Sequence, residues 1–380
     1  WGKRRRGTEG ESPPDTLPVM SPAIPSASRL DLGADVVTVT SALCDIESVS
    51  GHEQQIADAI EAVLRPRSHL DVTRDGHTIV ARTNLGRSER VVLAGHIDTV
   101  PLTDPPNLPA RLEGDNLVGR GTCDMKGGVA VQLRLAAALS EPSRDITYVF
   151  YDCEEVENER NGLARVGRNT PELLQADFAV LLEPTAGAVE GGCNGTLRVE
   201  VKAAGKAAHS ARPWNGHNAI HEAATILGRL VAYDPRVLSV DGLDYREALN
   251  AVGIRGGSAG NVIPDECVVT VNYRFAPNMS GEEALTHVRE LFEGYAVELK
   301  DLAEGARPGL HRPAAKAFVE ALGVPVHAKE GWTDVALFSK LSIPAVNYGP
   351  GDPNWAHHPQ EFCPVAQLVD AEAALLRWLA

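Results

Sequence analysis

VVLAGHID, residues 91–98, is an apolar run that stops at a histidine and an aspartate. Two later runs end in the same manner: residues 146–151 lead into Asp152-Cys153-Glu154-Glu155, and residues 178–182 lead into Glu183. Short apolar runs of this kind are typical of strands buried in a parallel sheet. Because ligands bind at the carboxyl ends of such strands in open α/β sheets, we expect the polar residues that follow them to meet in one crevice.

Strand-like and helix-like patterns alternate over residues 31–194. Helical periodicity covers residues 34–64, with a break at 48–51, and residues 126–139. The expected strands are residues 77–83, 91–94, 146–151 and 178–182. Such alternation predicts an α/β fold in which helices cover a mainly parallel sheet.

A different pattern occupies residues 195–302. The expected elements there are strands at 196–203, 248–254, 268–275 and 296–299, with helices at 217–232 and 281–292. Their order, β-α-β-β-α-β, predicts a ferredoxin-like α+β domain inserted into the first domain. The α/β pattern resumes over residues 303–380, with a strand at 344–348 and a closing helix at 366–379. Residues 1–30, rich in Gly, Ser and Pro after a basic cluster, are expected to form a disordered extension.

The composition excludes several classes of protein. A net charge of −15 over 380 residues argues against binding to nucleic acid or to anionic membranes. A membrane span is not expected, because no stretch of about 18 apolar residues occurs. The six cysteines are scattered without a CxxC pair, which indicates free thiols and a cytoplasmic protein.

Three of the polar residues suit a metal site. His96 and Asp98 lie two apart at the end of a strand and therefore share a face. His96 is expected to bind a metal, whereas Asp98 either binds it too or orients the imidazole. Asp124 lies among four glycines at the start of the helix expected at 126–139, where it either caps the helix or is aimed at a ligand.

Adjacent carboxylates at Glu154 and Glu155 repel each other at the end of a buried strand, unless a cation or proton offsets the cost. One of them could bind a metal while the other accepts a proton from a water molecule, and the residues alone do not say which. Glu183 follows an apolar strand, and His357 is next to a second histidine, His358. Imidazole nitrogens mixed with carboxylate oxygens favour zinc or a related divalent metal.

These motifs, taken in order, resemble the dinuclear zinc amidohydrolases and exopeptidases, a family that includes aminoacylase, acetylornithine deacetylase and glutamate carboxypeptidase. Within the family, the chain is most similar to succinyl-diaminopimelate desuccinylases of the actinobacterial type. The segments that carry this similarity are YDCEEVENERNG at 151–162, GWTDVA at 331–336 and PAVNYGPGDP at 344–353. The resemblance covers residues 34–380.

The resemblance implies a role for each polar residue of the crevice. His96 and Glu183 would bind one zinc ion, Glu155 and His357 the other, and Asp124 would bridge the two through a segment with a cis peptide bond. Asp98 would orient His96, and Glu154 would be the general base. Glu361 matches the acidic residue that closes the last histidine motif. Two Zn²⁺ ions per subunit are therefore expected, with Co²⁺ as an alternative.

In the family, the inserted domain forms a homodimer and lends groups to the active site of the other subunit. The resemblance makes His209 the residue that stabilises the oxyanion there, and it makes Asn261 and Arg274 substrate-binding residues. Trp332 occupies the position of a substrate-binding threonine, so Thr333 is the substitute candidate. The implied reaction is removal of succinate from a small molecule, N-succinyl-L,L-2,6-diaminopimelate. The alternative is deacylation of acetylornithine or a carboxypeptidase activity, because these relatives share the same catalytic residues.

Overall fold

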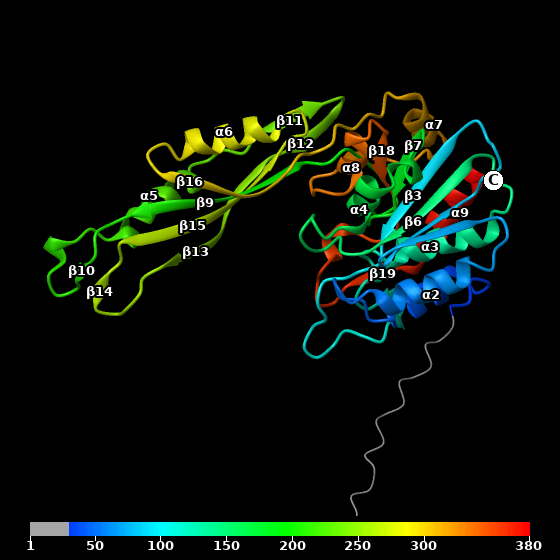
Figure 1. Ribbon diagram of the computed structural model, residues 1–380, viewed down its shortest axis with the longest axis horizontal. Helices are drawn as coiled ribbons and strands as arrows, with labels where there is room; N and C mark the ends of the chain where they lie inside the picture. Colours follow the sequence, from blue (N-terminus) through cyan, green and yellow to red (C-terminus); the bar gives the residue numbers. More distant parts are fainter. Residues whose placement is uncertain (1–29) are drawn as a thin grey trace, which may run out of the picture.

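The computed structural model describes residues 30–380, so almost all of the extension expected at 1–30 falls outside the described residues. Figure 1 shows two parts: an α/β domain and a long, narrow arm that leaves it on one side. We use "arm" for residues 195–303. Within the described range, none of the helices is both long enough and apolar enough to span a membrane. Its six cysteines are all buried and unpaired.

The central sheet of the α/β domain is mainly parallel, as the sequence predicts. In spatial order its strands are β1 (Asp71–Asp75), β2 (Thr78–Arg82), β6 (Asp145–Tyr151), β3 (Arg90–His96), β7 (Phe178–Leu181), β18 (Ala345–Asn347), β8 (Val189–Gly191) and β17 (Val326–Ala328). The pairs that involve β3 are parallel, and so are β7–β18 and β8–β17. The pairs β1–β2, β2–β6 and β8–β18 are antiparallel.

Helices cover both faces of this sheet, which explains why its strands are continuous apolar runs rather than alternating ones. One face packs against α1 (Val36–Cys44), α2 (Gln54–Leu64), α3 (Lys126–Ala138), α7 (Pro313–Leu322) and α9 (Val365–Leu379). The other face packs against α4 (Gly162–Asn169) and α8 (Val335–Lys340). Successive residues of β3 serve the two faces, because Leu93 packs toward α3 and Val92 toward α4 and α8.

The arm has the predicted order of elements. Its main elements are β9 (Gly195–Ala204), α5 (Ala219–Val231), β13 (Ala248–Gly256), β15 (Glu266–Phe275), α6 (Gly281–Leu291) and β16 (Ala296–Ala303). The sheet order is β13-β15-β9-β16, and all neighbours are antiparallel. Both helices pack on one face of this sheet around a separate apolar cluster.

Several short elements were not anticipated from the sequence. The arm carries a hairpin of β11 (Val237–Val240) with β12 (Leu243–Arg246), and its tip carries β10 (Ala208–His209) paired with β14 (Val262–Ile263). A small separate sheet joins β4 (Arg111–Glu113), β5 (Asn116–Val118) and β19 (Phe362–Pro364). The last two strands in the order of the central sheet, β8 and β17, were missed as well, since each spans only three residues outside a longer apolar run.

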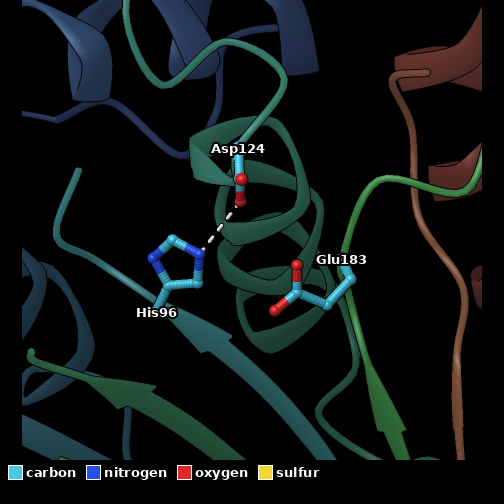
Figure 2. A group of neighbouring side chains, drawn as sticks. All are labelled: His96, Asp124 and Glu183. Carbon is cyan, nitrogen blue, oxygen red and sulfur yellow. Dashed lines mark hydrogen bonds and ion pairs between the residues drawn. The ribbon is translucent and has the colours of Figure 1, made fainter. Parts of the chain in front are cut away.

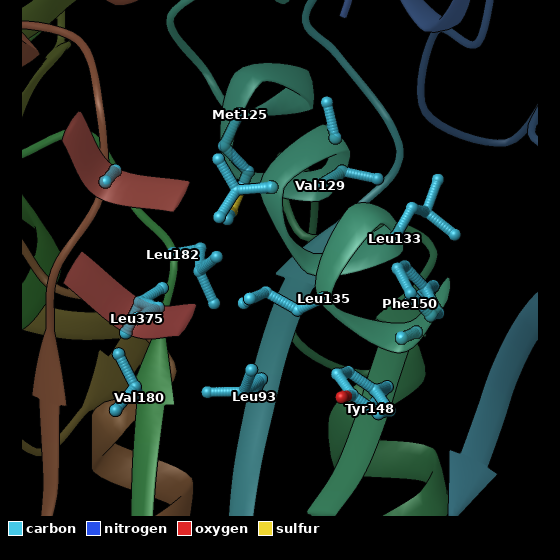
Figure 3. Close-up of a cluster of buried hydrophobic side chains, with 14 of the residues drawn as sticks. Leu93, Met125, Val129, Leu133, Leu135, Tyr148, Phe150, Val180, Leu182 and Leu375 are labelled. Carbon is cyan, nitrogen blue, oxygen red and sulfur yellow. The ribbon is translucent and has the colours of Figure 1, made fainter. Parts of the chain in front are cut away.

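Close packing of α3 against the sheet depends on Gly128. A Cβ atom at this position would lie 2.1 Å from the carbonyl oxygen of Leu182, which is far inside van der Waals contact. Figure 3 shows the apolar side chains that fill the same interface, among them Met125, Val129 and Leu182. Gly128 therefore allows the helix that follows Asp124 to lie against the end of β7.

Replacing Gly128 with alanine is expected to lower the free energy of unfolding by about 1–3 kcal/mol, because helix and strand must move apart. Gly228, in α5, is the matched control, since a Cβ there meets nothing within 4 Å. Gly228→Ala is expected to raise the free energy by about 0.5–1 kcal/mol through helix propensity alone. Denaturant unfolding of both variants measures the difference, and equal effects would contradict the packing role of Gly128.

Candidate dinuclear metal centre

The polar residues that follow three parallel strands meet at one edge of the central sheet. His96 is the last residue of β3, Glu154 and Glu155 come after β6, and Glu183 comes after β7. The strands β6, β3 and β7 are neighbours, so these side chains share one end of the sheet. The spatial convergence predicted from the sequence is therefore observed.

Two further residues reach the same place from loops. Asp124 directly precedes α3, and the peptide bond between it and Met125 is cis. His357 lies in the loop that connects β18 to β19, in a left-handed conformation with φ of 63°. The side chain of Asp124 is 12% exposed and that of His357 is 51% exposed, so the centre is open to solvent on the His357 side.

Asp124 belongs to two groups of residues that could each hold a metal ion. In the first group, with His96 and Glu183, one ligand atom of each residue lies within 4.8 Å of the others (Figure 2). In the second group, with Glu155 and His357, the same condition holds. The Oδ1 atom of Asp124 lies 3.0 Å from Nε2 of His96, and its Oδ2 atom lies 3.3 Å from Nε2 of His357. One carboxylate thus faces both groups with different oxygens.

A third group contains His96, Glu154 and Glu155. The distances alone therefore permit Glu154 to be a ligand as well as a base. Nε2 of His357 lies 2.9 Å from Oε1 of Glu155, so this glutamate is associated with His357 rather than with His96. Glu154 belongs to neither of the two groups that contain Asp124, but it lies beside one member of each, His96 and Glu155.

The charges of this cluster favour a bound cation. Burial raises the pKa of Glu183 to about 7, and the charge of Asp124 adds to the effect. Burial raises the pKa of Glu155 in the same way. Hydrogen bonds to Asp124 and Glu155 raise the pKa of His357 to about 10. Each shift reports an excess of negative charge removed from water, which a divalent metal would neutralise, so the donor set fits the predicted metals.

Asp98 acts on the site through its neighbours. Its Oδ1 accepts a hydrogen bond from the backbone N–H of Glu154 at 3.0 Å, and its Oδ2 accepts from the N–H of Glu155 at 3.1 Å and the hydroxyl of Ser50 at 2.7 Å. Nδ1 of His96 lies 3.0 Å from the backbone oxygen of Asp98 and 3.5 Å from its carboxylate. Asp98 therefore anchors the glutamate pair as well as the imidazole, and both of its oxygens are occupied.

The tip of the arm holds two of the predicted residues far from the centre. His209 lies in β10, and Asn261 lies just before β14, where its backbone oxygen accepts a hydrogen bond from Ser210 at 2.9 Å. In Figure 1 this tip is at the opposite end of the molecule from the α/β domain. A single chain therefore does not bring His209 and Asn261 to the metal centre.

Arg274 lies at the base of the arm. It is on β15, a central strand of the arm sheet, and it pairs in register with Thr196 and Ala248. Burial lowers the pKa of its guanidinium, and the charge of Asp301 opposes this effect. Arg274 is thus not a solvated edge arginine.

Thr333 is buried beside the junction between the two domains. Its hydroxyl donates to Oδ1 of Asn347 at 3.0 Å, so that hydrogen already has an acceptor. The indole N–H of the preceding residue, Trp332, donates to the backbone oxygen of Glu304 at 3.2 Å. The loop is therefore hydrogen-bonded to Glu304, the residue that directly follows the arm.

Two buried charged residues near the centre were not identified from the sequence. Lys329 lies 2.7 Å from Glu190 and donates to the backbone oxygen of Pro184 at 3.4 Å, directly after Glu183. No local pattern indicates this lysine. Asp334 precedes α8 as a capping aspartate would, yet its side chain makes no capping bond and instead accepts from Asn161 at 3.0 Å.

Comparisons with known proteins place this geometry in a family. Residues 92–380 match the model of peptidase family M20/M25/M40. A Mycobacterium tuberculosis protein named DapE is 54% identical over 353 residues, which cover 92% of this chain and 99% of that protein. A Corynebacterium glutamicum relative named succinyl-diaminopimelate desuccinylase is 46% identical over 362 residues, which cover 92% and 98% of the two chains.

Solved structures share the fold at lower identity. The crystal structure of a tripeptidase from Staphylococcus aureus superimposes with a TM-score of 0.73 at 23% identity, over 92% of this chain and 97% of that one. The family match covers well over half of the sequence, and the two bacterial relatives align along nearly their full length. The chain therefore belongs to peptidase family M20/M25/M40.

Proposed function

We propose that this protein is a metal-dependent amide hydrolase that removes succinate from N-succinyl-L,L-2,6-diaminopimelate and releases L,L-2,6-diaminopimelate. The observation that carries the reaction class is the position of Asp124 between two histidine-containing groups, with Glu154 next to both. The substrate is supported by the 46% identity to the Corynebacterium glutamicum desuccinylase over nearly the whole chain. The six unpaired cysteines fit a reducing compartment, the cytoplasm.

The proposed cofactor is a pair of Zn²⁺ ions, with Co²⁺ as the alternative. His96 and Glu183 would hold one ion, Glu155 and His357 the other, and Asp124 both. When bound, such ions lower the pKa of a shared water molecule and polarise the amide carbonyl. The mixture of nitrogen and oxygen donors is the observation that favours zinc.

Glu154 is the proposed general base and acid. Its carboxylate lies within 4.8 Å of ligand atoms of His96 and Glu155, so it is beside the place where an amide would react. It accepts a proton from the attacking water and then donates a proton to the leaving amine nitrogen as the C–N bond breaks. Asp98 keeps Glu154 in place through the backbone N–H.

The active form is proposed to be a homodimer joined through the arm. The strand β13 is at the edge of the arm sheet and exposes apolar side chains, Val252 at 60% and Ile254 at 55%. An exposed apolar edge strand is a ready site for pairing with a second copy. A dimer would carry His209 and Asn261 to the partner's metal centre, where His209 would stabilise the oxyanion and Asn261 would bind substrate. Arg274, at the base of the arm, would bind a substrate carboxylate.

Metal removal is expected to destabilise the protein. With Zn²⁺ at roughly 100 times its dissociation constant, each site should add about 2.7 kcal/mol to the free energy of unfolding, because only the folded chain assembles the ligands. Thermal unfolding of chelator-treated and zinc-loaded protein measures the change in Tm. Asp124→Asn, which weakens both groups, should show a much smaller rise, and equal Tm values with and without zinc would contradict the metal centre.

Glu154→Gln is expected to lower kcat for N-succinyl-L,L-2,6-diaminopimelate by about 10²- to 10⁴-fold, because the amide cannot accept the proton. The matched control is Glu157→Gln in the same loop, where the side chain is 70% exposed. The assay compares both variants with the wild type, and metal analysis checks that each retains its zinc.

The same assay includes N-acetylornithine and dipeptides as competing substrates. Faster turnover of either one than of the succinyl substrate would favour the deacetylase or the carboxypeptidase alternative. Unchanged kcat in Glu154→Gln would remove Glu154 from the proton transfer.

Mixing two inactive variants is expected to restore activity if the arm serves the partner's centre. In a mixed dimer of His209→Ala with Glu154→Gln, the first chain keeps its glutamate and receives His209 from the second. Random reassociation should return roughly a quarter of wild-type activity, since half of the dimers are mixed and each has one complete centre. Activity that does not rise above the sum of the two separate variants would contradict the exchange.

A further inference from the structure

Glu361 forms hydrogen bonds along the segment that leads to Asp124, residues 119–124, although it belongs to neither of the groups that contain Asp124. Its carboxylate is 1% exposed. The Oε1 atom accepts hydrogen bonds from three backbone N–H groups, those of Gly121 at 2.9 Å, Cys123 at 3.1 Å and Asp124 at 3.0 Å. Three donors converge on one oxygen, so the segment is wrapped around this carboxylate.

The other carboxylate oxygen of Glu361 is occupied by an arginine from the same segment. Its Oε2 lies 2.7 Å from Nη1 of Arg120, whose side chain is 4% exposed. The backbone oxygen of Glu361 also accepts a hydrogen bond from the N–H of Gly119 at 2.9 Å. Glu361 therefore holds residues 119–124 along their whole length, and neither carboxylate oxygen is left for a metal.

Glu361 is also part of the loop that presents His357. Its backbone N–H donates to the oxygen of His358 at 3.1 Å, which closes a turn directly after His357. Glu361 thus forms hydrogen bonds within both loops that supply the second metal group, the loop with Asp124 and the loop with His357. Glu155, the third member of that group, is placed separately, by Asp98.

The local structure of Asp124 does not hold it by itself. It lies before the first turn of α3, and that helix has no side-chain cap at its start. The backbone N–H of Asp124 has Glu361 as its acceptor. Fixing the backbone on each side of a ligand is how outer residues tune a metal site.

We infer that Glu361 is a positioning residue that sets the separation of Asp124 from His357 and thereby the affinity of the second metal group. The inference rests on the proposed function, in which these residues bind metal. It assigns to Glu361 a role in metal affinity that is distinct from its contribution to folding.

Glu361→Gln tests this role, because it keeps the size of the side chain and removes the charge that holds Arg120. Asp145→Asn is the matched control. Asp145 is a 3% exposed carboxylate that also accepts from two backbone N–H groups, those of Leu85 and Arg87, at 2.8 and 2.9 Å. It lies at the start of β6, whereas the metal centre lies beyond the end of that strand.

Metal-stripped wild type and both variants are titrated with Zn²⁺ against a chromophoric chelator, and the Tm of each apo protein is recorded. His357→Ala is titrated in the same way, and the zinc-binding constant that it abolishes is assigned to the second metal group. Glu361→Gln is expected to weaken this constant by about 10- to 100-fold. Asp145→Asn is expected to lower the apo Tm and to leave both zinc constants unchanged.

If both zinc-binding constants of Glu361→Gln equal those of the wild type, the inference is overturned, even when the Tm of the apo protein is lower. A purely structural residue would lower the Tm alone. If Glu361→Gln does not fold, Glu361→Asp carries the same test, since it keeps the charge and shortens the reach: a weaker second constant supports the inference, and two unchanged constants overturn it. A wild type that binds fewer than two zinc ions would instead contradict the proposed function, and the inference with it.

Discussion

The two carboxylate oxygens of Asp124 face different histidines, and this geometry depends on how the rest of the α/β domain positions the three residues. His96 reaches Oδ1 from the end of a central strand, and His357 reaches Oδ2 from a loop 233 residues further along the chain. A carboxylate in this position must be aimed from its backbone, because its side chain has few rotamers to choose from. The aim comes from the glycine-rich segment before α3 and from the close approach of that helix to β7 at Gly128.

The electrostatic cost of the centre explains the density of hydrogen bonds around it. Four acidic residues, Asp124, Glu154, Glu155 and Glu183, converge at the edge of an apolar sheet, where repulsion is poorly screened. Around them a further carboxylate, Asp98, is satisfied by backbone N–H groups and a hydroxyl. A centre of this kind is stable only when each carboxylate has either donors or a cation next to it.

Much of the fold was readable because buried strands and amphipathic helices leave long patterns. The three strands that end at the centre and the β-α-β-β-α-β order of the arm were predicted close to their observed positions. Three-residue strands such as β8, β17 and β19 were not, since their residues owe their conformation to distant partners. Among the polar residues of the centre, His96, Glu154, Glu155 and Glu183 were recognisable from their positions after apolar runs, whereas Asp124 and His357 lie in loops. Lys329 and Asp334 were not recognisable, because burial of a charged side chain is a property of the packed structure.

The sequence by itself determined the fold class, the order of elements and the set of polar residues at strand ends, because hydrophobic periodicity and turn residues act over short distances along the chain. Only the tertiary structure decided that His96 and His357 both lie beside the carboxylate of Asp124. It also decided which groups Asp98 and Glu361 hold, and how far His209 lies from the centre of its own chain. These depend on contacts between residues that are up to 241 positions apart, such as Arg120 with Glu361, and no local pattern encodes them. The remote position of His209 is the consequence with most bearing on the proposed function, since within one chain this residue lies far from the centre.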